Sequence, residues 1–305
     1  MQAHVFHPHA ARVVRMLDGA GHHVVALEDR EALDAALPEV RVLFAPMPPR
    51  SGWARARSLE WVQLAGAGVD HFLPSPDLPE RVVVTNARGV FADEAADHAM
   101  MMVLALTRRL PRLVEQQRAH RWEMHAMPKL AGRTLLVLGL GEIGRRVAAR
   151  AIAFGMRVRG VRRSGAPVDG VEVSAEVTPA LVAESDAVVI ALPRTAETDH
   201  ILPVDALAPH AVVVDVSRGG RVDAAALAAR LRAGTLGGAA LDVFEEEPLP
   251  PDSPLWDTPD LIVTPHVAGY GERYLARATA FFRANLERFA AGRPLRGLVD
   301  REARY

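Results

Sequence analysis

The chain has 305 residues, about twice the usual size of one domain, so its length predicts two domains. Half of the residues are hydrophobic and 24% are charged, a composition that suits packed cores and excludes a disordered chain. The 36 Lys and Arg residues balance the 37 Asp and Glu residues, which disfavours a general nucleic-acid binder, and the lack of cysteine excludes disulfides, thiolate metal sites and cysteine nucleophiles.

Short β-branched segments alternate with Ala- and Leu-rich segments of helical periodicity along almost the whole chain. This alternation predicts parallel sheets flanked by helices. In the first third, strands are expected at residues 3–7, 23–26, 42–45, 61–64 and 82–85. Helices are expected between them at 10–17 and 30–37, and one long helix follows at about 93–117.

A second series of strands and helices fills the remainder. Strands are expected at 134–138, 157–161, 187–191, 211–214, 238–241 and 261–264. Helices are expected at 142–154, 180–185, 224–233 and, after the last strand, 272–290. The fold class that follows is α/β, with two doubly wound parallel-sheet domains of the Rossmann or flavodoxin-like type.

No segment indicates a membrane or a metal site. The first ten residues carry neither a basic leader nor an apolar stretch, and the most apolar helical run, 99–106, is far shorter than the ~20 residues a span needs. We therefore expect a cytoplasmic protein with no membrane partner. His4, His7 and His9 could share a strand face only loosely, so no metal is expected there, and the run Met100–Met102 is interpreted as helix core.

The clearest local motif is a set of three glycines between the strand at 134–138 and the helix after it. Gly139 permits a tight turn, Gly141 lets a diphosphate approach the backbone, and Gly144 lets the helix pack close to the strand. The helix N-terminus adds amide donors and a positive dipole end. Glycine triplets also occur as plain turns, but this context favours dinucleotide binding. The expected cofactor residues here are Gly139, Leu140, Gly141, Glu142, Ile143 and Gly144.

Arg162, Arg163 and Ser164 follow the strand at 157–161, where an NAD-binding domain would carry a carboxylate for the ribose 2′-hydroxyl. A carboxylate would repel a 2′-phosphate, whereas guanidinium groups bind one through paired contacts. These three residues therefore predict a preference for NADP(H), with NAD(H) as the second choice. The alternative is that both arginines are solvated side chains in an arginine-rich chain.

Five motifs occur in order along the chain. Residues 64–70 read LAGAGVD, 92–98 read ADEAADH, 213–223 read VVDVSRGGRVD, 238–249 read GAALDVFEEEPL, and 261–269 read LIVTPHVAG. Together they resemble the D-isomer-specific 2-hydroxyacid dehydrogenases, most closely the glyoxylate/hydroxypyruvate reductase branch. The resemblance covers essentially the whole chain. Asp97 and Asp215 depart from it, because many members carry glutamate and asparagine there.

The resemblance implies a discontinuous substrate-binding domain of residues 1–96 and 271–305, a dinucleotide-binding domain of residues 97–270, and an active site in the cleft between them. It makes Arg218 the anchor of the keto oxygen and carboxylate, His266 the general acid, and Glu247 the partner that orients His266. A ketone that accepts hydride develops negative charge on its oxygen, so a fixed guanidinium and a proton donor both lower the barrier.

The resemblance also implies further contacts. The amides of Ala67 and Gly68 would join Arg218 and His266 in binding the substrate. The remaining cofactor residues, which line the cleft or lie at the nicotinamide, would be Leu192, Pro193, Thr198, Val216, Ser217, Asp242 and His266.

The activity expected is reduction of a small 2-keto acid, such as glyoxylate or hydroxypyruvate, to the D-2-hydroxy acid. Formate or phosphite oxidation stays open within the same fold, and an NAD(H)-sensing, corepressor-like protein without turnover is the alternative from another class. Retention of Arg218, Glu247 and His266 argues against a pure sensor. The resemblance also implies a homodimer, in which Trp122 either reaches the partner's active site or packs within its own chain.

Overall fold

The computed structural model describes residues 1–19 and 21–303, which form two compact units. The first unit consists of residues 1–91 and the C-terminal segment from residue 272 onward, and the second consists of residues 92–271. The sequence places the corresponding boundaries at 96/97 and 270/271. The first border falls earlier in the structure because the helix that opens the second unit already begins at Ala92.

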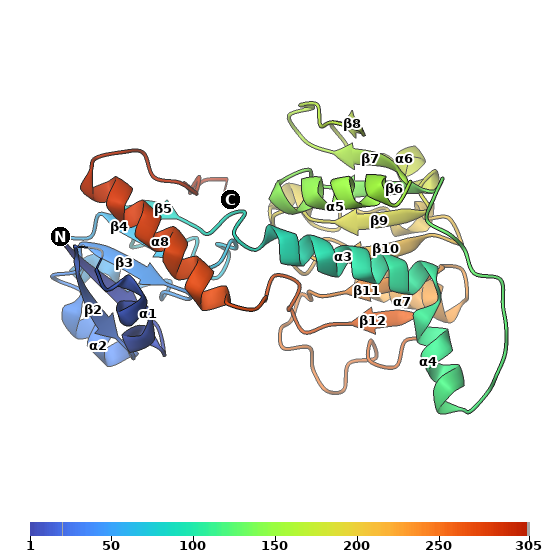
Figure 1. The fold of residues 1–305 in the computed structure, drawn as a ribbon, viewed down its shortest axis with the longest axis horizontal. Coiled ribbons are helices and arrows are strands. Elements are labelled where there is room, and N and C mark those ends of the chain that lie inside the picture. The colour runs from blue at the N-terminus through green and yellow to red at the C-terminus, as the bar shows by residue number, and fades with distance from the viewer. Residues whose placement is uncertain (20, 304–305) are drawn as a thin grey trace. The chain divides into compact units, whose positions relative to one another are not determined.

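The first unit is built on a five-stranded parallel sheet of order β2-β1-β3-β4-β5, the strand order of flavodoxin-like folds (Figure 1). Its strands are β1 (Gln2–Phe6), β2 (His23–Leu27), β3 (Val42–Ala45), β4 (Trp61–Leu64) and β5 (Val83–Thr85). Its helices are α1 (Ala10–Leu17), α2 (Arg30–Ala36), the 3₁₀ turn η1 (Trp53–Arg55) and α8 (Tyr274–Ala290). Helices α1 and α8 cover one face, where Phe282 stacks on Phe44 with ring centroids 4.8 Å apart.

The second unit is built on a seven-stranded parallel sheet of order β12-β11-β10-β9-β6-β7-β8. Its strands are β6 (Thr134–Leu138), β7 (Arg157–Val161), β8 (Val171–Ser174), β9 (Ala187–Ile190), β10 (Val212–Asp215), β11 (Gly238–Leu241) and β12 (Leu261–Val263). Its helices are α3 (Ala92–Thr107), α4 (Leu110–Arg118), α5 (Glu142–Ala153), α6 (Pro179–Ala183), α7 (Ala224–Arg232) and the 3₁₀ turns η2 (Ala196–Thr198) and η3 (Val204–Ala206). The two sheets confirm the predicted fold class.

Burial on both faces explains why the central strands of the second sheet are almost wholly apolar. Strands β6, β9 and β10 contain no exposed residue. Helices α3 and α5 cover one face, and α6 and α7 cover the other. Met100 and Met102 of α3 lie in the core, as predicted, but the same prediction is wrong for Met101, whose place on the outer face of the helix leaves it half exposed. No helix in the described part of the chain is long and apolar enough to cross a bilayer.

One expectation about secondary structure is wrong, and one strand is missing from the expected set. The long helix expected at 93–117 is two helices, α3 and α4, separated at Arg109, whose φ of 52° is left-handed. Pro111 in the first turn of α4 explains the break, because its ring has no N–H and would clash with the carbonyl of Thr107 in a continuous helix. Strand β8 was not expected; its four residues, VEVS, make it a short edge strand beside β7.

Candidate active site and cofactor loop

The carboxyl ends of parallel strands lie at one edge of a sheet, the edge where open α/β sheets bind ligands. In the second unit, the loops that follow β6, β9, β10, β11 and β12 therefore start at the same edge. The glycine motif, residues 192–198, Arg218, Asp242 and His266 all lie in these loops. The sheet topology thus gathers most of the site residues expected from the sequence.

His266 and Glu247 form a close pair. Nδ1 of His266 lies 2.7 Å from Oε2 of Glu247, and both side chains are partly exposed, at 43% and 34%. The other oxygen of Glu247 accepts a 2.9 Å hydrogen bond from the amide of Phe244, which fixes the carboxylate. With Nδ1 engaged, Nε2 is the ring nitrogen left to exchange a proton with a substrate.

Asp242 fixes the loop that carries His266. It is buried, and its Oδ1 accepts hydrogen bonds from Oγ1 of Thr264 at 2.6 Å and from the amide of Val267 at 2.9 Å. Its Oδ2 accepts one from the amide of Ala268 at 2.9 Å, and its carbonyl accepts one from the amide of His266 at 2.8 Å. The residue expected at the nicotinamide therefore also determines where the histidine lies.

His98 belongs to the same network, although the sequence assigned it no role. From α3, its Nε2 lies 3.2 Å from Oγ1 of Thr264 and 3.8 Å from Oδ1 of Asp242. Burial lowers the pKa of His98 and outweighs the opposing effect of Asp242. The neutral ring is therefore favoured near pH 7. His98 is the last residue of the motif at 92–98, but only the fold shows that its side chain faces Thr264.

Arg218 follows β10 in a tight turn and is partly buried. Its Nη1 donates a 2.6 Å hydrogen bond to the carbonyl of Ser217. Val216 and Ser217 are buried, and the amide of Val216 donates to the carbonyl of Ile190 in β9 at 3.2 Å. The turn that presents the guanidinium is thus part of the sheet edge.

The glycine motif has the shape that a dinucleotide diphosphate requires. Gly139 has a φ of 98°, and a Cβ at Gly144 would lie 1.9 Å from the carbonyl oxygen of Gly139. A Cβ at Gly141, in contrast, would meet no atom within 4 Å, and no side chain caps the N-terminus of α5. Gly139 and Gly144 are therefore required by the turn and the helix packing, while Gly141 keeps the backbone accessible. These residues fit the cofactor.

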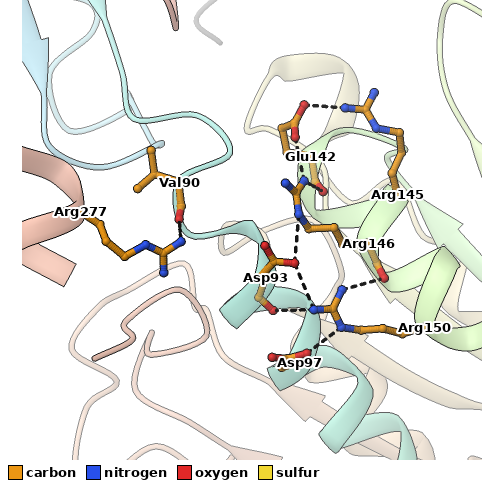
Figure 2. A network of polar contacts seen from close by, with 8 residues as sticks. All are labelled: Val90, Asp93, Asp97, Glu142, Arg145, Arg146, Arg150 and Arg277. Atoms are coloured by element: carbon orange, nitrogen blue, oxygen red, sulfur yellow. Dashed lines mark hydrogen bonds and ion pairs between the residues drawn. The ribbon is translucent and has the colours of Figure 1, made fainter. Parts of the chain in front are cut away.

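Glu142 would bring negative charge to this loop, but two arginines compensate it (Figure 2). Arg145 and Arg146 contact its carboxylate at 2.5 and 2.7 Å, and hydrogen bonding from Arg146 lowers the pKa of Glu142. Figure 2 also shows how α3 is tied to α5. There Arg150 contacts Asp97 at 2.6 Å, so the aspartate that departs from the family pattern has a structural partner.

Arg162 and Arg163 lie just after β7, as expected, and differ in environment. Arg162 is partly buried and lines a pocket of about 540 Å³ together with Arg145 and Asp169. Arg163 forms an ion pair at 3.0 Å with Glu197, and both side chains are about 70% exposed, at 69% and 73%. Such a pair contributes little to stability and can exchange for another anion. Ser164, which follows, is exposed.

The other expected residues lie in three places. Leu192 and Pro193 follow β9, where Oγ1 of Thr198 donates a 2.8 Å hydrogen bond to the carbonyl of Pro193. Ala67 and Gly68 lie in the first unit after β4, and their turn is held by Asn86, whose Nδ2 donates to the carbonyl of Ala67 at 2.6 Å. Trp122 is 94% exposed in the segment after α4.

Residues 100–268 match the family described as D-isomer specific 2-hydroxyacid dehydrogenase, NAD binding domain. This match covers more than half of the chain. The chain belongs to the D-isomer-specific 2-hydroxyacid dehydrogenase family. The resemblance inferred from the five motifs is thereby confirmed.

The similar proteins differ in length and named activity. D-3-phosphoglycerate dehydrogenase from Mycobacterium leprae (strain TN) is 35% identical over 83% of this chain, but the chain spans only 48% of that relative. Glyoxylate reductase from Korarchaeum cryptofilum (strain OPF8) is 34% identical over 81% of this chain and 78% of its own. The crystal structure of the NADPH-dependent glyoxylate/hydroxypyruvate reductase from Sinorhizobium meliloti, in complex with NADP and sulfate, is 30% identical with a TM-score of 0.89, covering 100% of this chain and 99% of that one.

Proposed function

We propose that this dehydrogenase reduces a small 2-keto acid, glyoxylate or hydroxypyruvate, to the 2-hydroxy acid of D configuration where that carbon is chiral, with NADPH as the preferred reductant. The observation that carries the proposal is the 2.7 Å contact between His266 and Glu247 in a unit that also presents Arg218 at the same sheet edge. The glyoxylate and hydroxypyruvate reductases among the similar proteins support the choice of substrate.

The chain's own residues bind the substrate and supply the proton. The nicotinamide, when bound, supplies the hydride. Arg218 binds the substrate carboxylate and keto oxygen and stabilises the negative charge that grows on that oxygen. His266 gives a proton from Nε2 to the same oxygen, which completes the conversion of C=O to CH–OH, while Glu247 holds Nδ1 and stabilises the imidazolium before transfer. The backbone amides of Ala67 and Gly68 are proposed as further hydrogen-bond donors to the substrate carboxylate.

The cofactor lies, in this proposal, along the edge of the second sheet. Its diphosphate loop consists of residues 139–144, Glu142 included, and the N-terminus of α5, which no side chain caps, favours the negative charge of the diphosphate. Residues 162–164, directly after β7, include no carboxylate, and this and the presence of Arg162 and Arg163 support the preference for a 2′-phosphate.

Initial rates of NADPH and NADH oxidation, with glyoxylate and with hydroxypyruvate, test the proposal. We expect turnover with NADPH that is lost in His266→Ala, while that variant still binds NADPH as measured by fluorescence titration. Cofactor binding by the unmodified protein without turnover on either keto acid would contradict the reductase and favour the sensing protein. Normal turnover in His266→Ala would show that His266 is not the general acid.

We also propose a homodimer. Trp122 and Met124 are 94% and 91% exposed in the irregular segment between α4 and β6, and large apolar side chains that exposed are typical of contact surfaces. Light scattering after size-exclusion chromatography should give twice the chain mass of 33.0 kDa for the unmodified protein. A monomer at micromolar concentration would contradict the proposal.

A further inference from the structure

Asp215 is buried directly beneath the turn that carries Arg218. It is the last residue of β10, is 1% exposed, and lies between Ile190 of β9 and Leu241 of β11. Its Oδ1 accepts hydrogen bonds from both the amide and the hydroxyl of Ser217. The carboxyl group therefore anchors the residue immediately before Arg218.

Arg221 holds the other side of the same turn, and it is fully buried. Its Nη2 donates to the carbonyl of Gly219 at 3.3 Å and to the carboxylate of Asp199. Its Nη1 donates to Oγ1 of Thr198 at 2.6 Å and to the carbonyl of Thr195 at 3.2 Å. One guanidinium thus joins the Arg218 turn to the segment 195–199, which follows β9.

A third contact closes the turn against the segment that contains Glu247. A Cβ at Gly219 would lie 1.8 Å from the carbonyl oxygen of Phe244, so only glycine allows this approach. The amide of Phe244 in turn donates to Glu247. The positions of Arg218 and of the partner of His266 are therefore linked through backbone contacts.

We propose that Asp215 and Arg221 are positioning residues for Arg218, two buried groups of opposite charge that clamp its turn from both sides. Arg221 has a second task, which is to keep the 195–199 segment in register with that turn. The inference rests on the proposed function, because it assigns Arg218 to the substrate. Neither residue is placed to touch substrate itself; each acts through the backbone on either side of Arg218.

The burial of Asp215 makes the clamp sensitive to pH near neutrality. Burial raises the pKa of Asp215 to about 7, and the bonds from Ser217 and the charge of Arg221 lower it less. Asp242, the other carboxylate that faces it, adds repulsion and is itself engaged by Thr264 and near His98. Only the ionised carboxylate holds Ser217 through charge-assisted hydrogen bonds, which are roughly twice as strong as neutral ones.

Asp215→Asn keeps the shape and one acceptor but cannot ionise. We expect kcat/KM for the keto acid to fall roughly tenfold at pH 8, mainly through KM for the keto acid, with KM for NADPH within about twofold of its original value. The ratio of kcat/KM of the unmodified protein to that of the variant should rise with pH through about 7, because only the unmodified protein gains the ionised carboxylate there. Groups that both proteins share cancel from the ratio. A ratio near one at every pH would overturn the role of Asp215.

Arg221→Lys retains the charge but loses the planar fork. It should lower kcat/KM for the keto acid and also raise KM for NADPH, roughly tenfold each, because the 195–199 segment is released with the turn. Arg133→Lys is the matched control, since Arg133 forms a partly buried ion pair with Asp186 at the opposite edge of the same sheet. Equal effects of the two lysine variants would overturn the specific role of Arg221.

Hydrogen exchange separates failure of the clamp from failure of the proposed function. Amides of residues 216–220 should exchange faster in Asp215→Ala and Arg221→Lys than in the unmodified protein, while those of residues 100–106 in α3 stay unchanged. Faster exchange at residues 216–220 in the variants, with no keto-acid turnover in either the variants or the unmodified protein, would support the clamp and contradict the reductase. Unchanged exchange at 216–220 would overturn the clamp whatever the activity.

Discussion

Replacing Asp215 by asparagine should change stability in a way that depends on pH. Burial raises the pKa of this carboxyl from 3.8 to about 7 in the folded chain. Between these two values the folded chain keeps a proton that the unfolded chain has released. The folded state therefore loses stability relative to the unfolded state as pH rises through this window. A carboxamide at this position does not titrate, so the variant escapes this loss.

The size of the effect follows from the width of the window. Each pH unit between the two pKa values changes the free energy of unfolding by about 1.4 kcal/mol, so the full difference is on the order of 4 kcal/mol above pH 7. At pH 5 roughly a third of it is already present. The stability advantage of Asp215→Asn should therefore grow by about 3 kcal/mol between pH 5 and pH 8.5 and level off above the folded pKa.

Urea unfolding of both proteins, followed by circular dichroism at constant ionic strength, measures this difference. Subtracting the two free energies at each pH removes the titrations that the proteins share. Asp252→Asn, at an exposed position, is the control and should show no such trend. A difference that stays flat from pH 5 to pH 8.5 would refute the reasoning, because Ser217 and Arg221 would then compensate the burial of the charge completely.

Three further predictions concern the proposed site. Glu247→Gln should lower kcat roughly 10- to 100-fold and leave the Kd for NADPH nearly unchanged, because the hydrogen bond to Nδ1 of His266 becomes weaker. An unchanged kcat would show that Glu247 does not orient the acid. Replacing Arg162 and Arg163 together by serine should raise KM for NADPH roughly 10- to 100-fold but leave KM for NADH unchanged. Equal changes of KM for both cofactors would show that the arginines do not bind the 2′-phosphate. Gly144→Ala should lower the free energy of unfolding by about 1–3 kcal/mol because its Cβ meets the Gly139 carbonyl, whereas Gly141→Ala should weaken NADPH binding at nearly constant Tm; equal thermal shifts in the two variants would contradict the assignment of these glycines.

The sequence by itself determined the features that depend on local pattern. The alternation of β-branched strands and helices predicted both parallel sheets, because strands buried on two faces must be apolar throughout. The spacing of Gly139, Gly141 and Gly144 predicted a turn that the backbone adopts as expected. Pro111 is the local signal of the break between α3 and α4, which the expected single helix at 93–117 does not include.

Only the tertiary structure decided which charged groups are buried and what they face. Arg221 is one arginine among many in the sequence, and nothing local distinguishes it from the solvated ones. It becomes a clamp because the segment 195–199 supplies Thr198 and Thr195, which lie 23 and 26 residues away along the chain. In the sequence, Asp215 and Asp242 are likewise two aspartates at strand ends, with nothing local to distinguish them. The protonation of Asp215 depends on desolvation by the neighbouring strands, and the hydrogen bonds of Asp242 depend on donors from a distant loop. Neither is set before the chain folds.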